Sequence, residues 1–371
     1  MSWRYPLFDL DYGEEEKRAV IEVINSGWIT QGPKTEEYEE KLAQYFGVDY
    51  ALATSSGTTA LHLAYLSAGI KPGDRVLVPS LTFVATVTPL IWIGVKPVFV
   101  DIHSLKYPNI SPDEVERKAR GAKAVVFVHY AGFYRFIDEV KDIADRYGLI
   151  LIEDASHAIG TEVEGKFAGT FGLVGAFSTF TNKNLSTGEG GFLLTNDKKI
   201  YEKALLLRSH GLTTSSYSKF TQGDTLYDVV EIGYNYRITE IQAALGIVQL
   251  EKLREKNEKR RRLVRRYREI LSDKVLIPFD DYENSANYIF PVVLPDGVSR
   301  DEVVHKLVEA GIQTSVHYPP VHKFSAMRSR FGELNLPVTE EFSSRELTLP
   351  LYPALSEEDV SYIAETLLKA L

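Results

Sequence analysis

Short apolar runs alternate with amphipathic stretches between about residue 50 and residue 195 of the chain. Several of the apolar runs are rich in β-branched residues, and none exceeds a few residues, which is typical of buried strands. The stretches between them, such as 58–68 and 137–147, repeat their apolar positions with the period of a helix. Strands are predicted at 51–54, 75–78, 97–101, 123–129 and 149–153, with further candidates at 172–180 and 191–195. This alternation predicts an α/β fold with a mostly parallel seven-stranded sheet flanked by helices.

The pattern changes in the last third of the chain. One long helix is predicted over 239–271, and after it come strand candidates at 288–294 and 313–316. Further helices are expected from about Asp301 and from Ser356. A single hydrophobic core seldom serves a chain of 371 residues, so two domains are predicted. We place a large domain, which includes the N-terminal segment, at residues 1–250, and a small C-terminal α+β domain at residues 251–371.

The amino-acid composition excludes or disfavours several kinds of binding partner and cofactor. The chain has 42 basic and 51 acidic side chains, a net charge of −9, which disfavours nucleic acid as the main partner. A basic run at 259–266 is interpreted as a solvated helix face rather than a nucleic-acid patch, because the whole chain is acidic and Glu251, Glu255 and Glu258 alternate with basic residues just before the run. The absence of cysteine excludes disulfides, thiolate metal sites and cysteine nucleophiles. No metal site is predicted.

Targeting signals are not evident in the sequence. The N-terminus reads Met-Ser-Trp-Arg-Tyr-Pro and lacks the apolar core of a signal peptide. The apolar run at 84–95 is shorter than the roughly 20 residues that span a bilayer. We therefore expect a cytoplasmic protein without a membrane partner.

Polar residues cluster where the predicted strands end. Ser55–Thr59 follow the first strand, His129 ends the fourth, Asp154 follows the fifth and Ser178 closes the next. In an open α/β sheet, ligands bind at the carboxyl ends of the strands. These positions predict a ligand site at that edge.

Each of these features has a structural alternative. Ser55–Thr59 is equally explained as a helix cap and as an anion cup in which Gly57 lets the backbone approach a phosphate. Asp154 either caps the following turn or keeps a cofactor's pyridine nitrogen protonated. His157 lies close enough to flank the same ring, although a lone histidine is more often structural.

Lys183 lies in a loop just before the glycine-rich stretch 188–191. Most lysines are surface charges. A lysine in a glycine-dense loop after a strand, however, can serve as a Schiff-base amine close to a ligand. Ser178, five residues earlier, can add a hydroxyl to the phosphate cup.

Taken together, these segments resemble the DegT-type sugar-nucleotide aminotransferases, which depend on pyridoxal 5'-phosphate (PLP) and have fold type I of the PLP transferases. The resemblance runs through the segments 27–33, 56–61, 82–86, 153–158, 183–191, 208–211, 233–237 and 349–353. The order and spacing of these segments together make the resemblance specific.

The resemblance implies a role for each of the matching residues. Lys183 is expected to form the Schiff base and Asp154 to hold the pyridine nitrogen, and these two are the catalytic residues. The remaining implied cofactor contacts are Gly57, Thr58 and Ser178 at the phosphate, Phe83 stacked on the ring, His157 near the ring hydroxyl, and Asn235, which reaches the partner subunit's phosphate in a homodimer. Trp28, Thr30, His317 and Tyr318 fall in segments that face the sugar nucleotide.

The implied reaction moves an amino group from an amino acid, L-glutamate in most relatives, to a keto-sugar nucleotide. The cofactor alternates between PLP and its pyridoxamine form. The commonest acceptor among relatives is a nucleoside-diphosphate 4-keto-6-deoxyhexose, on routes to amino sugars and surface polysaccharides. Two alternatives stay open: another PLP enzyme of the same fold type, such as a sugar dehydratase or a transaminase of small keto acids, and a non-catalytic regulatory relative. Relatives that dehydrate sugars replace the lysine with histidine, so Lys183 favours transamination.

The acceptor end of the site is the least defined by sequence. Phe133–Phe136 stands where relatives often carry a proline-containing turn, and this departure puts the identity of the sugar in doubt. Phe133 is a candidate to cover the sugar or base, together with Trp28 and Tyr318. The candidate diphosphate donors are His317, His322, Lys323 and the partner's Arg237.

Overall fold

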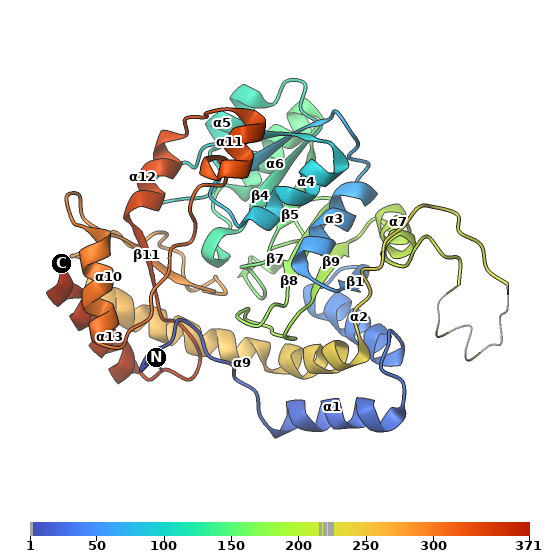
Figure 1. Ribbon diagram of the computed structural model, residues 1–371, viewed down its shortest axis with the longest axis horizontal. Helices are drawn as coiled ribbons and strands as arrows, with labels where there is room; N and C mark the ends of the chain where they lie inside the picture. The colour runs from blue at the N-terminus through green and yellow to red at the C-terminus, as the bar shows by residue number, and fades with distance from the viewer. Residues whose placement is uncertain (1–2, 215–216, 218–220, 222–225) are drawn as a thin grey trace.

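The computed structural model describes residues 3–214, 217, 221 and 226–371 (Figure 1). Strands and helices alternate through the first two thirds of the chain and helices dominate the rest. The elements are α1 (Glu14–Ser26), α2 (Pro33–Phe46), β1 (Tyr50–Thr54), α3 (Gly57–Ser67), β2 (Arg75–Pro79), η1 (Val84–Thr86), α4 (Thr88–Ile93), β3 (Lys96–Val100), α5 (Pro112–Lys118), β4 (Ala124–Val128), η2 (Tyr130–Gly132), α6 (Ile137–Tyr147), β5 (Ile150–Asp154), β6 (Glu162–Val163), β7 (Lys166–Phe167), β8 (Val174–Ser178), β9 (Gly191–Thr195), α7 (Lys198–Arg208), α9 (Glu240–Leu271), β10 (Phe290–Val293), α10 (Arg300–Glu309), η3 (Val321–Lys323), α11 (Ser325–Phe331), α12 (Pro337–Arg345), β11 (Glu346–Leu349) and α13 (Glu357–Ala370).

The central sheet has seven strands in the order β1-β9-β8-β5-β4-β2-β3. Parallel pairing joins β8 to β5, β5 to β4, β4 to β2 and β2 to β3. Strand β9 is antiparallel to both of its neighbours, β1 and β8. Strand β1 therefore points the same way as the parallel strands, and only β9 is reversed. The predicted mostly parallel seven-stranded sheet is confirmed.

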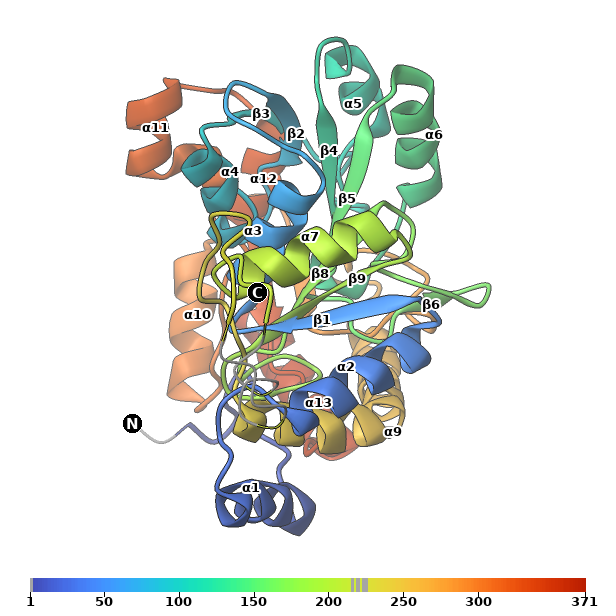
Figure 2. The ribbon, with the colours of Figure 1, turned by 90° about the vertical axis from the view of Figure 1, so that its right-hand side faces the viewer.

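Alternating side chains of the buried strands enter different layers, as the pleat of a strand requires. Val126 of β4 packs in the cluster covered by α3, α4 and α7, whereas Val125 and Phe127 pack in the cluster covered by α5 and α6. The ribbons show these two groups of helices on opposite sides of the sheet (Figure 2). All five residues of β4 are buried, which explains why this strand reads as a continuous apolar run.

Helix α9 connects the two ends of the molecule. Its first half packs with α2 against β1, β8 and β9, and its second half belongs to a separate buried cluster with β10, β11, α10 and α13. Tyr5 of the N-terminal segment is also part of that second cluster. The helix runs without a break across residue 250, and the division into domains at that residue stays a prediction.

The segment 313–316 does not form the predicted strand. It makes an isolated bridge at Ser315, whose backbone exchanges hydrogen bonds of 3.2 and 2.8 Å with Thr348. Thr348 lies in β11, which pairs in antiparallel fashion with β10. Strand β11 therefore lies between β10 and Ser315. After Ser315 the chain turns and brings His317 to the wall of a cavity, which is described below.

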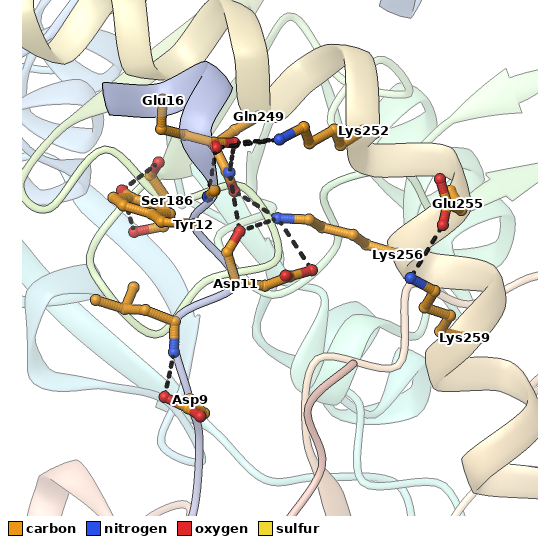
Figure 3. Close-up of polar contacts among 12 residues, drawn as sticks. Asp9, Asp11, Tyr12, Glu16, Ser186, Gln249, Lys252, Glu255, Lys256 and Lys259 are labelled. Atoms are coloured by element: carbon orange, nitrogen blue, oxygen red, sulfur yellow. Dashed lines mark hydrogen bonds and ion pairs between the residues drawn. The ribbon is translucent and has the colours of Figure 1, made fainter. Parts of the chain in front are cut away.

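The N-terminal segment and α1 are held to α9 by buried polar contacts (Figure 3). The Glu16 carboxylate accepts hydrogen bonds from Lys252 Nζ and Gln249 Nε2, both at 2.8 Å, and from the backbone N–H of Gly13 at 2.7 Å. One turn further along α9, Lys256 Nζ donates to the carbonyl of Asp11 at 2.8 Å. Charged hydrogen bonds therefore supply much of the attachment of α1.

Within the described part of the chain, no helix has the length and apolar character needed to cross a bilayer. The basic run of α9 is largely ion-paired. Its pairs include Lys259 with Glu255 at 2.9 Å, Arg261 with Glu258 at 2.7 Å and Arg266 with Glu269 at 3.0 Å. A cytoplasmic location stays a prediction.

The Glu16 anchor predicts a pH-dependent contribution to stability. Although burial opposes ionisation of Glu16, its donors prevail and lower its pKa from 4.5 to about 2. The carboxylate therefore stabilises the fold above pH 4.5, and this contribution is lost as the pH falls through about 2. Glu16→Gln should lower the free energy of unfolding by about 1–2 kcal/mol at pH 7. Denaturant unfolding at pH 7 and pH 3 measures the difference, which should shrink at the lower pH.

Glu255→Gln is the matched control, because it removes a carboxylate from the same region whose partner, Lys259, is on the exposed face of α9 (Figure 3). This variant should unfold at the same denaturant concentration as the wild type. Equal effects of the two substitutions at pH 7 would contradict a special role for Glu16.

Candidate active site

A cavity of about 390 Å³ lies where the strands of the sheet end. Its walls come from the loops that follow β1, β2, β5 and β8 and from two segments of the C-terminal third. The lining residues are Ser56, Gly57, Thr58, Leu61, Thr82, Phe83, Ala85, Val128, Asp154, Ser156, His157, Ser178, Phe180, Asn182, Lys183, Glu189, Tyr288, His317 and Tyr318. The predicted edge of the sheet therefore carries a real cavity.

Lys183 reaches this cavity from the loop that follows β8. Its backbone N–H closes a turn onto the carbonyl of Phe180 at 2.8 Å, and its Nζ lies 4.0 Å from the centre of the Tyr288 ring. Burial lowers the pKa of Lys183 to about 7, and the nearby charge of Asp154 opposes that shift. A sizeable fraction of the amine is consequently neutral, and therefore nucleophilic, near neutral pH.

Asp154 ends β5 and is held by three donors. Its Oδ2 accepts a hydrogen bond from Thr86 Oγ1 at 2.7 Å, and its Oδ1 accepts from the hydroxyl of Ser156 at 2.6 Å and from the backbone N–H of Ser156 at 3.2 Å. Thr86 is in turn 2.6 Å from Thr82, oxygen to oxygen. These contacts fix the orientation of a carboxylate that lines the cavity.

The N-terminus of α3 meets the end of β8 at the cavity wall. Ser56 caps the helix by accepting a hydrogen bond from the backbone N–H of Thr59 at 3.2 Å. A Cβ at Gly57 would lie 2.7 Å from Cβ of Ser178, so only glycine allows this approach. Gly57, Thr58 and Ser178 line the cavity together. The segment is therefore a helix cap whose next residues line the cavity, and the anion cup stays a prediction.

Aromatic and histidine rings form another part of the cavity wall. Tyr318 Oη is 2.8 Å from His157 Nε2, and the His157 ring centre is 4.3 Å from that of Tyr288. The exposed ring of Phe83 lies 5.8 Å from that of Tyr318. Burial and the charge of Lys183 hold the pKa of His157 well below its usual range. His157 therefore acts as a neutral ring.

A buried pair of amides joins the loops that carry these residues. Asn184, the neighbour of Lys183, donates from Nδ2 to Asn257 Oδ1 at 2.8 Å and to the carbonyl of Ala286 at 2.7 Å. Asn257 of α9 donates in turn to the carbonyl of Ile159 at 3.0 Å. The loop of Lys183, the loop that follows Asp154 and the segment before Tyr288 are thereby tied to one helix.

The family of the chain follows from comparison with known proteins. The model of the DegT/DnrJ/EryC1/StrS aminotransferase family matches residues 10–368. The chain belongs to this family. This aminotransferase is also 36% identical over 365 residues to the uncharacterized protein MJ1066 of Methanocaldococcus jannaschii, covering 96% of the chain and 94% of MJ1066.

Solved structures of similar fold include enzymes of two kinds. The aminotransferase is similar to PseC of Helicobacter pylori, an aminotransferase involved in the biosynthesis of pseudoaminic acid, with 32% identity, a TM-score of 0.92 and coverage of 100% and 99% of the two chains. It is also similar to the E. coli GDP-4-keto-6-deoxy-D-mannose-3-dehydratase, with 27% identity, a TM-score of 0.91 and coverage of 99% and 100%.

The aminotransferase is PLP-dependent, as its family is, and solved structures of similar proteins include PLP and pyridoxamine forms. The donor set of the cavity fits this cofactor. It contains a lysine amine of lowered pKa, an oriented carboxylate and a helix N-terminus that glycine leaves open. These groups match the aldehyde, the pyridine nitrogen and the phosphate in charge and hydrogen-bonding capacity.

Several residues singled out from the sequence lie outside the cavity lining. His129 is fully buried, and its Nε2 is 2.7 Å from Glu153 Oε2, so its expected place beside the ligand was wrong. Asn235 and Thr30 are exposed. Trp28 is half-buried and its ring centre lies 5.4 Å from that of Tyr217.

Three candidates for the acceptor end also point elsewhere. Phe133 is buried and stacks on Phe279 with ring centres 4.1 Å apart. His322 is buried between Ser80 at 2.6 Å and Glu340 at 3.0 Å, and Lys323 pairs with the same glutamate at 2.9 Å. Packing and ion pairing account for these residues.

The structure adds residues of the site that sequence reasoning missed: two that hold Asp154 and one that lines the cavity from the C-terminal third. Thr86 and Ser156 lie inside segments that the family resemblance covers, so position relative to Asp154 offered a signal for them. Tyr288 had no such signal, because it arrives from a segment about one hundred residues beyond Lys183.

Proposed function

We propose that this enzyme transfers an amino group from an amino acid, L-glutamate, to the keto group of a sugar nucleotide. The observation that carries this assignment is the presence of the Lys183 amine and the Asp154 carboxylate in the wall of the same cavity. The acceptor is proposed to be a nucleoside-diphosphate 4-keto-6-deoxyhexose, and the product an amino sugar for surface polysaccharide.

Each of these residues would contact a different part of the cofactor. Lys183 would bind its aldehyde carbon and Asp154 would hold its pyridine nitrogen in the protonated form. The proposed contacts to the rest of the cofactor are Gly57, Thr58 and Ser178 at the phosphate, Phe83 over the ring and His157 near the ring hydroxyl. When bound, PLP supplies an electron sink that lets a proton leave the α-carbon of the donor.

Lys183 would move that proton. Its pKa of about 7 allows the freed amine to accept a proton at Nζ and to return it, because a base works best when its pKa is close to the working pH. The carboxylate of Asp154 keeps its place throughout, since Thr86 and Ser156 orient both oxygens. His317 and Tyr318, which line the same cavity, would contact the sugar.

Two alternatives are less well supported. A dehydratase is favoured by the similarity to the E. coli enzyme, but dehydrating relatives carry histidine at the position of Lys183. A non-catalytic relative would not need an amine of lowered pKa beside an oriented carboxylate.

A panel of acceptors tests the proposed reaction. With glutamate as donor, a nucleoside-diphosphate 4-keto-6-deoxyhexose should be aminated with a kcat/KM about 100-fold or more above that of pyruvate. Mass spectrometry of the product measures amination directly. Turnover of free keto acids, with no keto-sugar nucleotide aminated, would contradict the proposed acceptor class.

The active unit is proposed to be a homodimer with shared active sites. Asn235 is exposed and does not line the cavity of its own chain, as expected of a residue that serves a partner subunit's phosphate. Trp28 and Thr30 also lie outside the lining of their own cavity and would face the sugar nucleotide of the partner subunit in the same way.

Mixing two inactive variants tests the shared site. Lys183→Ala should lower turnover by about 10²–10⁴-fold, and Asn235→Ala should weaken cofactor retention. After subunit exchange, half of the dimers are mixed and each has one site with both groups. Activity should therefore recover to about a quarter of the wild-type level. Confirmed exchange with no recovery would show that Asn235 serves its own subunit.

A further inference from the structure

A chain of hydrogen bonds leads from the cavity into the core of the C-terminal region. His317, which lines the cavity, has its Nδ1 2.9 Å from Thr348 Oγ1. Thr348 Oγ1 donates to Glu346 Oε1 at 2.5 Å. The other carboxylate oxygen accepts from the backbone N–H of His317 at 2.8 Å. Thr348 and Glu346 are completely buried in β11, so this chain is shielded from solvent.

The protonation of Glu346 decides which nitrogen of His317 carries the ring proton. While Glu346 is ionised, the hydroxyl of Thr348 must donate to it, and the threonine oxygen then accepts from Nδ1–H. His317 Nε2 is in that case a bare acceptor. A protonated Glu346 reverses both bonds, so that Thr348 donates to Nδ1 and the ring proton resides on Nε2.

Few charged groups face this chain. The charge of Lys183 acts on His317, the rings of His317 and His157 interact electrostatically, and all three residues line the cavity. The charge of Arg300 of α10 acts on Glu346. The neutral hydroxyls of Tyr130 and Tyr318 also lie close to Glu346, and Tyr130 donates to the carbonyl of His317 at 2.6 Å. Burial raises the pKa of Glu346 to about 8, and burial with the charge of Lys183 lowers the pKa of His317 to about 3. Near neutral pH a doubly protonated His317 is therefore disfavoured, whereas the protonated and the ionised forms of Glu346 are both populated.

We propose that Glu346 and Thr348 form a proton relay that lets His317 accept and donate a proton at the cavity without becoming a cation. Glu346 and Thr348 act through His317 and are positioning residues, whereas Nε2 of His317 is the atom that meets the reacting groups.

The transfer balances over the three residues. A proton leaves an ammonium group in the cavity, that of Lys183 or of the amino donor, and binds Nε2 of His317, directly or through one water. The proton on Nδ1 moves to Thr348 Oγ1, and the hydroxyl proton of Thr348 moves to Glu346 Oε1. One ammonium and one carboxylate become neutral, so no net charge is added to the interior. The reverse transfer returns a proton to the cavity.

This relay suits a reaction that proceeds in two halves. An amino donor arrives as an ammonium ion and must lose a proton before its nitrogen can attack. The second half of the cycle restores a proton to the nitrogen that leaves. A buried acid that stores this proton lets both halves run without exchange of that proton with bulk water.

Three variants of the holoenzyme separate the relay from a structural role. Thr348→Val removes the hydroxyl and keeps the volume, and Thr348→Ser keeps the hydroxyl. Glu346→Gln keeps the shape but fixes the direction of the hydrogen bonds, because its amide nitrogen can only donate to Thr348. The melting temperature of each variant shows whether it is folded. If Thr348→Val does not fold, the comparison of Glu346→Gln with Thr348→Ser is sufficient for the test.

The tautomer of His317 is the decisive readout. In ¹⁵N spectra of histidine-labelled protein, assigned with His317→Gln, the ring proton should move from Nε2 to Nδ1 as the pH rises, with a midpoint near pH 8. Thr348→Ser should keep this switch. In Glu346→Gln the proton should stay on Nε2 at every pH, and in Thr348→Val the switch near pH 8 should vanish. A switch with the wild-type midpoint in either of these two variants would overturn the relay.

The rate of amine transfer from the donor gives a second readout. Glu346→Gln and Thr348→Val should lower the single-turnover rate by about 10–100-fold with little change in donor affinity, and Thr348→Ser should restore it. Equal loss in the valine and serine variants would also overturn the relay. Because the tautomer is read without any acceptor, failure of the proposed sugar substrate leaves this test intact.

Discussion

The buried hydrogen bond between Asn184 and Asn257 is the constraint on which the active site depends. It ties the loop of Lys183 to α9, and α9 also holds the loop after Asp154 and packs against the C-terminal strands. A neutral hydrogen bond of this kind contributes only about 1 kcal/mol net, but an amide left unpaired in the core costs about 1–3 kcal/mol. Specific pairing of two buried amides therefore fixes the geometry of the site more than it stabilises the fold.

The chemistry of the cavity follows from this placement. Lys183 is carried into a buried position beside Asp154, where burial lowers the pKa of its amine to about 7. The same burial keeps His157 and His317 neutral, so among the described residues that line the cavity Lys183 supplies the cation beside Asp154, and its lowered pKa lets it lose that charge near neutral pH. A surface loop with the same sequence would carry an ordinary charged lysine.

Much of the fold was accessible from the sequence because buried strands and amphipathic helices have distinct periods. The helix at 137–147 was predicted with its observed ends, and the sheet was predicted as mostly parallel. The reversal of β9 and the pairing of β10 with β11 depend on contacts between distant segments, which periodicity does not record. The strand predicted at 313–316 is wrong for the same reason, because only Ser315 of that segment pairs with a strand.

The site residues that could be predicted are those that closely follow a strand in the sequence. Lys183, Asp154 and the cup around Gly57 follow strands directly, and all line the cavity. His129 follows a strand in the same way, but Glu153 on the neighbouring strand draws its ring into the core. Tyr288 and Glu346, whose carboxylate accepts a hydrogen bond from His317, come from segments far from Lys183 in the sequence. Only the packed structure shows that these segments reach the site.

Trapping the cofactor on the protein tests the central assignment, the reactivity of Lys183, most directly. Borohydride reduction of the PLP-loaded enzyme, followed by peptide mass spectrometry, should place one cofactor per chain on the peptide that contains Lys183. Lys183→Ala, which removes only a cavity-lining side chain, should stay folded and retain no covalent label. Stoichiometric label on any other lysine, or undiminished labelling of the Lys183→Ala variant, would contradict the assignment.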